Sequence, residues 1–227
     1  MKALAIDSAG TCISIAARND EKTVLLSLDI GMRQSEKILP SIAKVLEEVE
    51  LLPQDLDFSC LCLGPGSFTG LRLSFAALKA LQLSHNIPIY GIPTLTALAN
   101  PYKVWPGAVV PCIDAKKHRF YTAVYRNGVE CTSPCDIECK EIVTFLDCEE
   151  KVLCTGPDAK LLLEEIKSIK PDYDCSIIDV HSSNTALSLL DMAFEMHSRG
   201  EKPLEEYEGP VYIRPSEAEE SLLSKHG

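Results

Sequence analysis

Short, mostly apolar runs alternate with polar turn residues over the first 30 residues of the chain, and the spacing of apolar residues then becomes helical. The alternation predicts three strands in an antiparallel meander, with a turn at Asn19, Asp20 and Glu21 between the second and the third. From Ser35 or Glu36 onward, apolar residues recur every three or four positions, which predicts an amphipathic helix. The three predicted strands are 2–7, 12–17 and 23–28.

A second strand and helix follow the first helix. Pro40 is expected close to the start of that first helix, because proline fits a first helical turn without loss of a hydrogen bond. A short apolar run at 58–63 predicts a buried strand, and the spacing over 68–85 predicts another helix before a strand at 87–92. This order of elements predicts an α/β fold, with a mixed central sheet flanked by helices.

The turn between the strand at 58–63 and the helix at 68–85 is rich in glycine. Ser67 and Thr69 are candidate N-caps of the helix. The turn lacks the Gly-Lys-Ser/Thr ending of a P-loop and the Gly-x-Gly-x-x-Gly pattern, although its free amides could bind an anion. Ser67 also lacks the Gly-x-Ser-x-Gly context of a catalytic serine, so the sequence predicts no catalytic residue.

The helix at 68–85 is apolar on two sides. One face carries Phe68, Leu71, Phe75 and Leu78 and is expected to enter the core. Small residues on the opposite side would let a second helix approach closely. Either another element of the same chain or a partner helix is expected to cover that side, which consists of Leu73, Ala76, Ala77, Ala80 and Leu83.

The second half of the chain loosely repeats the first. Residues 100–107 form a break between two units, because proline and glycine cluster there. We therefore predict an N-terminal subdomain at 1–103 and a smaller, more divergent C-terminal subdomain at 104–227, leaving open that the last helix packs back on the first subdomain. The second half contains predicted strands at 108–114, 120–125, 151–154 and 174–180, and predicted helices at 159–168 and 184–199.

Charge and composition limit the functional classes. The chain has 227 residues, of which 46% are hydrophobic, and a net charge of -11, which disfavours autonomous binding to nucleic acid. The basic cluster at 116–119 is interpreted as a solvated hairpin turn, with a phosphate contact as the alternative. No leader sequence and no membrane span are predicted, so we expect a cytoplasmic protein with no membrane partner.

The ten cysteines are expected to be reduced thiols, because no leader sequence is predicted and the chain is longer than a small secreted domain. Cys60 and Cys62 read as core residues on one face of a strand. Cys131, Cys135 and Cys139 recur every fourth residue, but Pro134 would interrupt a helix through them and the spacing is not that of a structural zinc site. No metal site is predicted.

The residues that follow the first strand could bind a phosphate. Asp7, Ser8, Gly10 and Thr11 combine an acidic residue, hydroxyls and glycine, a set that can hold a magnesium-phosphate group but that also suits a plain turn. Asp114, at the end of the matching strand in the second half, could face the same ligand. The candidate cofactor residues are Asp7, Ser8, Gly66 and Ser67.

Five segments resemble the TsaB (YeaZ) family in order and spacing. They are 5–8, 31–40, 64–72, 113–115 and 210–214, and the most specific is Gly-Pro-Gly-Ser-Phe-Thr-Gly-Leu-Arg at 64–72. The resemblance implies an actin-like, Hsp70-like ATPase fold of the ribonuclease H-like type, with two related αβ subdomains. It also implies a non-catalytic scaffolding role in forming N6-threonylcarbamoyladenosine at adenosine-37 of tRNAs that read ANN codons. The alternative is an independent ATP-binding hydrolase or phosphotransferase of the same superfamily.

The resemblance further implies TsaD and TsaE as partners, with a homodimer as an option for the isolated chain and tRNA contacted through the complex. It implies no firmly bound cofactor and leaves room for ATP or ADP with magnesium at the complex interface. Where the catalytic paralogue TsaD holds a metal with a His-x-x-x-His pair, this chain has Thr94 and Leu98, and it has Gln34 where family members often carry histidine. The residues implied for the dimer interface are Leu39, Ala43, Phe68, Arg72, Leu73, Ala76, Ala77, Lys79 and Ala80.

Overall fold

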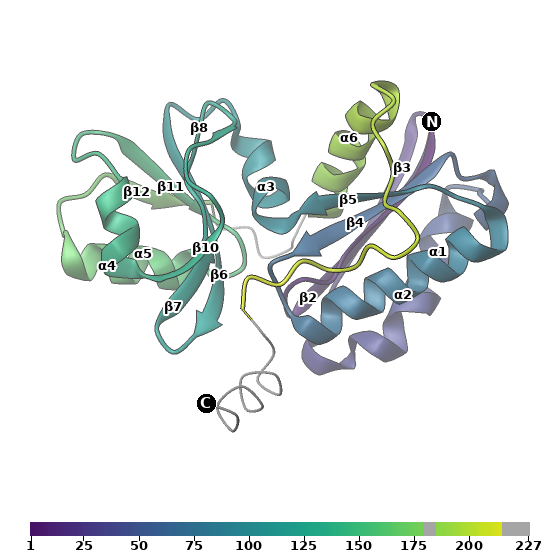
Figure 1. Cartoon of the computed structure of the whole chain (residues 1–227), viewed down its shortest axis with the longest axis horizontal. Helices are drawn as coiled ribbons and strands as arrows, with labels where there is room; N and C mark the ends of the chain where they lie inside the picture. Colours follow the sequence, from purple (N-terminus) through teal and green to yellow (C-terminus); the bar gives the residue numbers. More distant parts are fainter. Residues whose placement is uncertain (179–184, 215–227) are drawn as a thin grey trace.

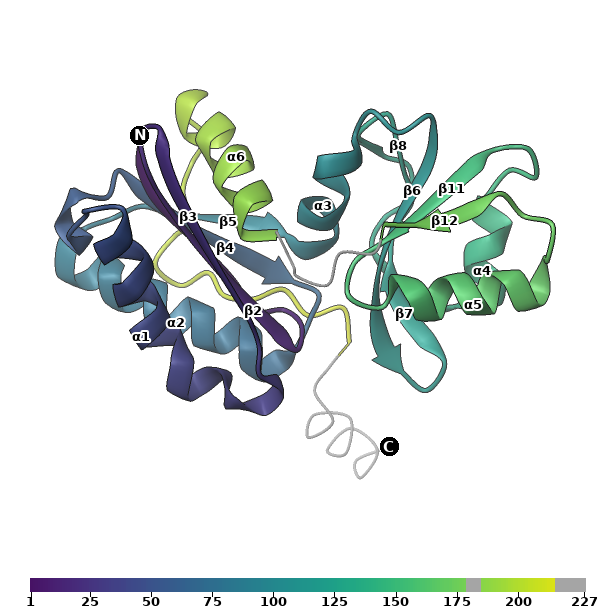
Figure 2. The ribbon, with the colours of Figure 1, turned by 180° about the vertical axis from the view of Figure 1, so that it is seen from behind.

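The computed structural model describes residues 1–178 and 185–214, which form two lobes around two mixed β-sheets (Figures 1 and 2). The first sheet contains β1 (Lys2–Asp7), β2 (Cys12–Asn19), β3 (Lys22–Asp29), β4 (Phe58–Gly64) and β5 (Ile89–Pro93). Its strand order is β3-β2-β1-β4-β5. The meander of β1, β2 and β3 is antiparallel, whereas β4 and β5 run parallel to β1.

The second sheet repeats this topology. It contains β6 (Gly107–Lys116), β7 (Arg119–Thr122), β8 (Tyr125–Arg126), β9 (Val129–Glu130), β10 (Cys135–Glu138), β11 (Lys151–Thr155) and β12 (Cys175–Ile177). Its main order is β10-β7-β6-β11-β12, with β8 pairing beside β6 and β9 beside β8. If β8 and β9 are set aside, each sheet has its third strand at one edge and its fifth at the other, so the two lobes are related units.

Helices cover both faces of the two sheets. They are α1 (Gln34–Glu48), α2 (Phe68–His85), α3 (Thr94–Ala99), α4 (Cys139–Ile142), α5 (Ala159–Ile169) and α6 (Thr185–Ser198). Short 3-10 turns occupy Gly31–Arg33, Pro53–Asp55, Asn100–Tyr102 and Val143–Phe145. Figure 1 shows α1 and α2 together on one side of the first sheet, with α6 on the other side.

Strand β1 shows why the first sheet is covered on both faces. Leu4 and Ile6 point to one face and join the core formed with α1 and α2. Ala3 and Ala5 point to the other face and join a core with α6. Successive side chains of a strand alternate between faces, so this run of large and small apolar residues accommodates helices on both sides.

The third helix of each unit crosses to the other lobe. Leu95 and Ala99 of α3 pack with Val109 and Ile113 of β6, in the second sheet. Conversely, α6 packs on β1, β2, β4 and β5, although its residues fall in the range predicted for the C-terminal subdomain. The two crossing helices contact each other between the lobes.

Two local features differ from the sequence expectations. Pro40 lies inside α1, not close to its start, because the 3-10 turn at Gly31–Arg33 leads directly into a helix that begins at Gln34. The strand predicted at 120–125 is split into β7 and β8, because Val124 N–H donates to Thr132 Oγ1 (2.9 Å) and its carbonyl accepts from the backbone of the loop before β10. The predicted ends of one strand at Val180 and of one helix at Asn184 lie outside the described residues.

The cysteines of special interest occupy separate environments. Cys60 and Cys62 are buried in β4, as expected. Cys131 is exposed, Cys135 begins β10 and Cys139 begins α4, so no helix aligns these three thiols. Within residues 1–178 and 185–214, no three His, Cys, Asp or Glu side chains are grouped to hold a metal ion. In the same residues, no helix has the length and apolar character needed to cross a membrane.

Candidate functional site

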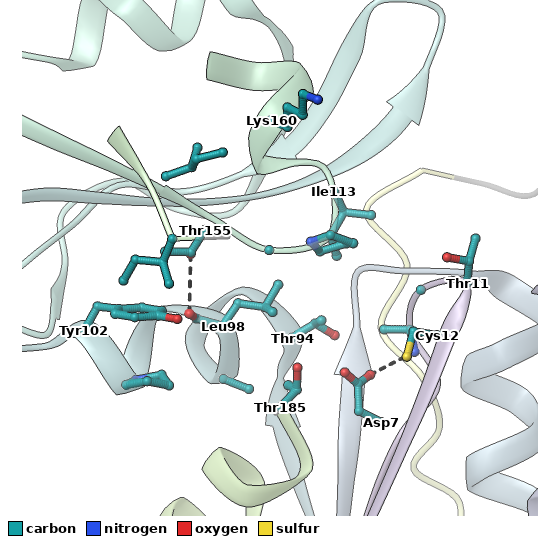
Figure 3. A pocket seen from close by; sticks show the side chains of 18 of the residues that line it. Asp7, Thr11, Cys12, Thr94, Leu98, Tyr102, Ile113, Thr155, Lys160 and Thr185 are labelled. Atoms are coloured by element: carbon teal, nitrogen blue, oxygen red, sulfur yellow. Dashed lines mark hydrogen bonds between the residues drawn. The ribbon is translucent and has the colours of Figure 1, made fainter. Parts of the chain in front are cut away.

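A cavity of about 600 Å³ lies at the junction of the two lobes. Its wall is formed by the turn between β1 and β2, by α3, by the loop that follows β11 and by the beginning of α6 (Figure 3). Thr155 Oγ1 donates to the carbonyl oxygen of Leu98 at 3.4 Å, which ties the second sheet to α3 at the cavity. The cavity therefore has walls from both lobes.

The polar groups of the cavity are mostly oxygens. Asp7 and Asp29 supply carboxylates, while Thr11 and Thr94 add hydroxyls and Lys160 adds an ammonium group. Carboxylate and hydroxyl oxygens are ligands suited to a hydrated magnesium ion, and a lysine can bind a phosphate as a point charge. The groups present are thus compatible with a magnesium-phosphate ligand.

Asp7 is the predicted cofactor residue that reaches the cavity. It ends β1 and is only 5% exposed, and its carboxylate accepts the backbone N–H of Ala9 at 2.9 Å. This hydrogen bond to its own loop closes an Asx turn, which explains why an acidic residue suits the end of the strand. The carboxylate is positioned by the backbone and also lies in the cavity wall.

The other three candidate cofactor residues join the glycine-rich turn to the turn after β1. Ser8 is fully buried, and its hydroxyl donates to the carbonyl oxygen of Gly70 at 2.7 Å. A Cβ on Gly66 would lie 2.6 Å from the Cβ of Ala9, so this close approach requires glycine. Ser67 donates its backbone N–H to Ala9, and its side chain caps α2 by accepting from Gly70 N–H at 3.2 Å. Ser8, Gly66 and Ser67 are absent from the cavity wall, and their role in cofactor binding stays a prediction.

Gln34 of α1 forms hydrogen bonds with the same turn after β1. Its side chain is 5% exposed, and Nε2 donates to the carbonyl oxygens of Gly10 at 2.7 Å and Thr11 at 3.2 Å. One amide group therefore satisfies two backbone acceptors of the β1–β2 turn. A neutral imidazole has a single N–H donor and could not make both hydrogen bonds.

Asp114 does not share the cavity with Asp7, contrary to the suggestion that the two carboxylates face one ligand. It accepts hydrogen bonds from Lys116 Nζ and from the Lys116 backbone N–H, each at 2.7 Å. Partial burial acts to raise the pKa of the Asp114 carboxyl, but these hydrogen bonds outweigh it and hold the pKa below its usual value. The tight turn of Lys116, Lys117 and His118, all at positive φ, directs this carboxylate to its own hairpin.

Thr94 and Leu98 both line the cavity from α3. Thr94 Oγ1 accepts the backbone N–H of Gly64 at 3.1 Å, which links the glycine-rich turn to this helix. A hydroxyl and an aliphatic side chain at these two positions cannot reproduce a pair of imidazole ligands.

The residues predicted for a dimer interface fall into two groups. Leu39 is 63% exposed, and Ala43, Arg72, Ala76 and Ala80 are also exposed on α1 and α2. In contrast, Ala77 is only 7% exposed and belongs to the core between these helices and the sheet. The partly exposed members of the predicted set are Phe68, Leu73 and Lys79. The interface stays a prediction, and exposed Leu83 adds a further apolar group to this face.

Several cavity residues were not predicted from the sequence. Asp29, Tyr102, Thr155 and Lys160 come from four separate segments. None belongs to a recognisable motif, because only the packing of the two lobes brings these segments to one place. The matching topology of the two sheets is the signal that points to their junction.

Comparison with known proteins agrees with this architecture. The family model for "TsaD: tRNA N6-adenosine threonylcarbamoyltransferase" matches residues 31–175. The chain is 30% identical over 132 residues to the tRNA threonylcarbamoyladenosine biosynthesis protein TsaB of Bacillus subtilis, covering 57% of this chain and 58% of that protein. It is 28% identical to TsaB of Escherichia coli across 99% of this chain and 100% of that protein. The chain thus spans just over half the length of the first of these relatives and all of the second.

Solved structures show the same fold. YeaZ from Pseudomonas aeruginosa superposes with a TM-score of 0.79 at 21% identity, covering 93% of this chain and 99% of that one. Component A of (R)-2-hydroxyglutaryl-CoA dehydratase from Acidaminococcus fermentans has a TM-score of 0.52 at 12% identity, covering 87% and 99%. Together with the two related lobes, these similarities confirm the actin-like ATPase fold expected from the sequence. The chain belongs to the TsaD family of the matching model and, within it, to the TsaB (YeaZ) proteins.

Proposed function

We propose that the protein is a non-catalytic dimerisation and scaffolding subunit in tRNA threonylcarbamoyladenosine biosynthesis. It acts with TsaD and TsaE in forming the modified base at adenosine-37 of tRNAs that read ANN codons. The observation that carries this proposal is the exposed apolar face of α1 and α2, on a chain whose relatives are named for this pathway. Partner binding is the role for which this face is suited.

The shape and composition of the face favour a helical partner. Leu39 and Leu83 are 63% and 81% exposed, and the small side chains of Ala43, Ala76 and Ala80 lie exposed on the same two helices. Large apolar groups beside small ones let a partner helix approach closely and bury its own apolar face. TsaD is the proposed partner, and a second copy of this chain is the occupant expected in its absence.

The cavity chemistry supports a partner role over the transfer reaction itself. Thr94 and Leu98 occupy the places where a histidine pair would be needed to hold the catalytic metal of the paralogue. The net charge of -11 also disfavours a long contact with tRNA, so we propose that tRNA is bound through the complex. ATP or ADP with magnesium is proposed to bind at the complex interface and not as a resident cofactor of this chain.

Reconstitution tests the proposal directly. The chain is combined with TsaD, TsaE, tRNA, ATP and threonylcarbamoyl-adenylate, and modified adenosine is measured by mass spectrometry of the digested tRNA. Modification is expected to require all three proteins, and this chain alone should give none. Equal modification in the absence of this chain would overturn the assignment.

A second candidate is an independent ATP hydrolase or phosphotransferase. The cavity favours it through the carboxylates of Asp7 and Asp29 and the ammonium group of Lys160. Titration calorimetry with magnesium-ATP and a phosphate-release assay on the isolated chain distinguish the two candidates. Tight binding with turnover that is lost in Asp7→Asn would favour the enzyme, whereas neither is expected of a scaffolding subunit.

A further inference from the structure

Two helices, α3 and α6, meet at the junction of the two lobes. Helix α3 leads from β5 to β6, and α6 follows β12 and packs on the first sheet. Asn100 Nδ2 donates to Ser188 Oγ at 3.3 Å, and this hydroxyl donates to the carbonyl oxygen of Ala97 at 2.9 Å. Helices α3 and α6 therefore lie side by side between the lobes, as Figures 1 and 2 also show, which is a geometry suited to a hinge.

An extended segment at 204–214, which we call the tether, returns across the first lobe after α6. Leu204 N–H donates to the carbonyl oxygen of Ile89 at 2.8 Å, beside β4 and β5. Lys79 Nζ of α2 donates to the carbonyl oxygens of Glu205 (3.0 Å) and Glu206 (3.2 Å). The segment is thus fastened to the sheet and to a helix, and Figure 1 shows it in yellow between them.

The tether also contacts the glycine-rich turn. Val211 N–H donates to the carbonyl oxygen of Leu63 at 2.8 Å, and the Val211 carbonyl contacts the position that a Cβ on Gly64 would occupy. Gly64 has φ of 116°, so its conformation and its contact both require glycine. Tyr212 packs on the Phe68 ring with centroids 4.8 Å apart, and its hydroxyl accepts from Arg72 Nε at 3.2 Å.

The end of the tether is bonded to the second lobe. Arg214 Nε donates to Asp136 Oδ2 at 2.8 Å, and its Nη1 donates to the carbonyl oxygen of Ala115 at 3.0 Å. Asp136 in β10 also accepts from Arg119 Nε at 2.8 Å. The Asp136 and Arg214 side chains are 14% and 21% exposed, so their pairing is partly shielded from water. Charge-assisted hydrogen bonds in such a setting are stronger than those of an open surface pair.

We propose that the tether limits rotation of the lobes about the α3–α6 hinge, and thereby sets the width of the cavity, through the bonds of Arg214. The contact between α3 and α6 allows a rotation that a further attachment, made to different strands, prevents. None of the tether residues lines the cavity, so the tether affects the cavity through the relative position of the lobes and not by direct contact with a ligand. Phe68 and Arg72 lie at the start of α2 and contact Tyr212 of the tether. Binding of a partner to the exposed face of α2 and opening of the cavity therefore both act on the tether.

Hydrogen–deuterium exchange on the isolated 227-residue chain tests the tether without reference to TsaD or tRNA. In Arg214→Ala, the amides of Leu204 and Val211 are expected to exchange roughly tenfold faster, because charge-assisted hydrogen bonds that hold the segment are lost. Small-angle scattering should show a larger radius of gyration. Lys202→Ala, an exposed basic residue just before the tether, is the charge-matched control and should leave both measurements unchanged.

A pair of variants on the second lobe separates the tether from general loss of stability. Asp136→Asn removes the negative charge that Arg119 and Arg214 share and replaces one acceptor oxygen with an N–H donor, so it should reproduce the faster exchange of the tether amides. Arg119→Ala removes the neighbouring pair within the second lobe and should leave those amides protected. Unchanged exchange and scattering in Arg214→Ala, or faster exchange confined to the second lobe in Asp136→Asn, would overturn the proposal.

Discussion

The hydroxyl of Ser8 donates to the carbonyl oxygen of Gly70 at 2.7 Å, across 62 positions of sequence. This hydrogen bond is fully buried and joins the end of β1 to the first turn of α2. The contact is close enough that a Cβ on Gly70 would collide with the Ser8 carbonyl oxygen. Ser8 and Gly70 therefore pack too closely for a larger residue at position 70, and the glycine-rich turn serves to hold the start of a helix against the end of a strand.

Two substitutions measure the strength of this joint. Ser8→Ala should lower the free energy of unfolding by about 1–2 kcal/mol, because a buried hydrogen bond is lost. Gly70→Ala should cost more, about 3 kcal/mol, because the added methyl must displace backbone. Urea denaturation followed by circular dichroism provides the measurement. Gly209→Ala is the control, since a Cβ there meets nothing within 4 Å, and a comparable loss in that variant would refute the explanation.

The contribution of the Gln34 amide to stability can be tested by replacing its N–H donor with an acceptor. Gln34→Glu places a carboxylate against the carbonyl oxygens of Gly10 and Thr11, which now accept hydrogen bonds from Nε2. At pH 7 we expect a loss of about 2–3 kcal/mol in unfolding free energy, since two acceptors face an anion. The introduced carboxyl should have a pKa raised above the unfolded value of about 4.3 when folded. The loss should therefore shrink as the pH falls through the raised folded pKa, and it should stop changing below about 4.3, where the unfolded group is also protonated.

Denaturation of this variant and the wild type at pH 4 and pH 7 provides the comparison. Gln34→Met, which has a similar length and no charge, is the control and should show little extra pH dependence. A penalty in Gln34→Glu that is the same at both pH values would show that the backbone carbonyls do not face the side chain.

A pH dependence of opposite sign is expected from Glu150. Burial acts to raise the pKa of its carboxyl, but hydrogen bonds from Arg126 and from Asp147 N–H outweigh it, so the pKa is lowered. The stability that this group contributes is fully present above its unfolded pKa of about 4.3 and is lost as the pH falls through the lower folded pKa. Glu150→Gln should cost about 1–2 kcal/mol at pH 7 and almost nothing at pH 2.

Acid titration of stability checks this prediction in the variant and in the wild type. The neighbouring Glu149 is exposed, and Glu149→Gln serves as the matched control. If both substitutions changed the acid dependence equally, the Arg126 pair would not be the source of the effect.

The sequence predicted best those elements whose first and last residues are determined by their neighbours in the chain. The helix predicted over 68–85 has those bounds in the structure, because Ser67 caps its first turn and Asn86 ends it in the left-handed conformation. The short apolar run at the start of the chain likewise predicted the strand β1, which is buried. Pro40 was misleading, since the preceding 3-10 turn and the Gln34 contacts set the start of α1 earlier than proline alone suggests.

The candidate site was less accessible from the sequence. Asp7 was identified because an acidic residue followed by hydroxyls and glycine can hold a magnesium-phosphate group, whereas Lys160 and Thr155 reach the cavity through lobe packing alone. Asp114 was a candidate to face the same ligand as Asp7, but the hydrogen bonds it accepts are local and come from Lys116. Topological equivalence of two strands thus did not make their terminal carboxylates equivalent.

The predicted partner face can be separated from the core by two adjacent alanines of α2. Ala76 is exposed, whereas Ala77 is 7% exposed and packed within the core. Ala77→Glu would bury an unpaired carboxylate and should destabilise the fold by several kcal/mol, so it cannot test an interface alone. Ala76→Glu should change stability by less than about 0.5 kcal/mol, because its side chain points to solvent.

Size-exclusion chromatography with light scattering then measures association of Ala76→Glu with TsaD. A charge on this face should weaken the complex at least tenfold, since a helix that packs there would have to desolvate the carboxylate. Glu47→Gln on exposed α1 is a milder control that removes a charge instead of adding one. A folded Ala76→Glu variant that binds TsaD with wild-type affinity would place the partner on a different surface of the protein.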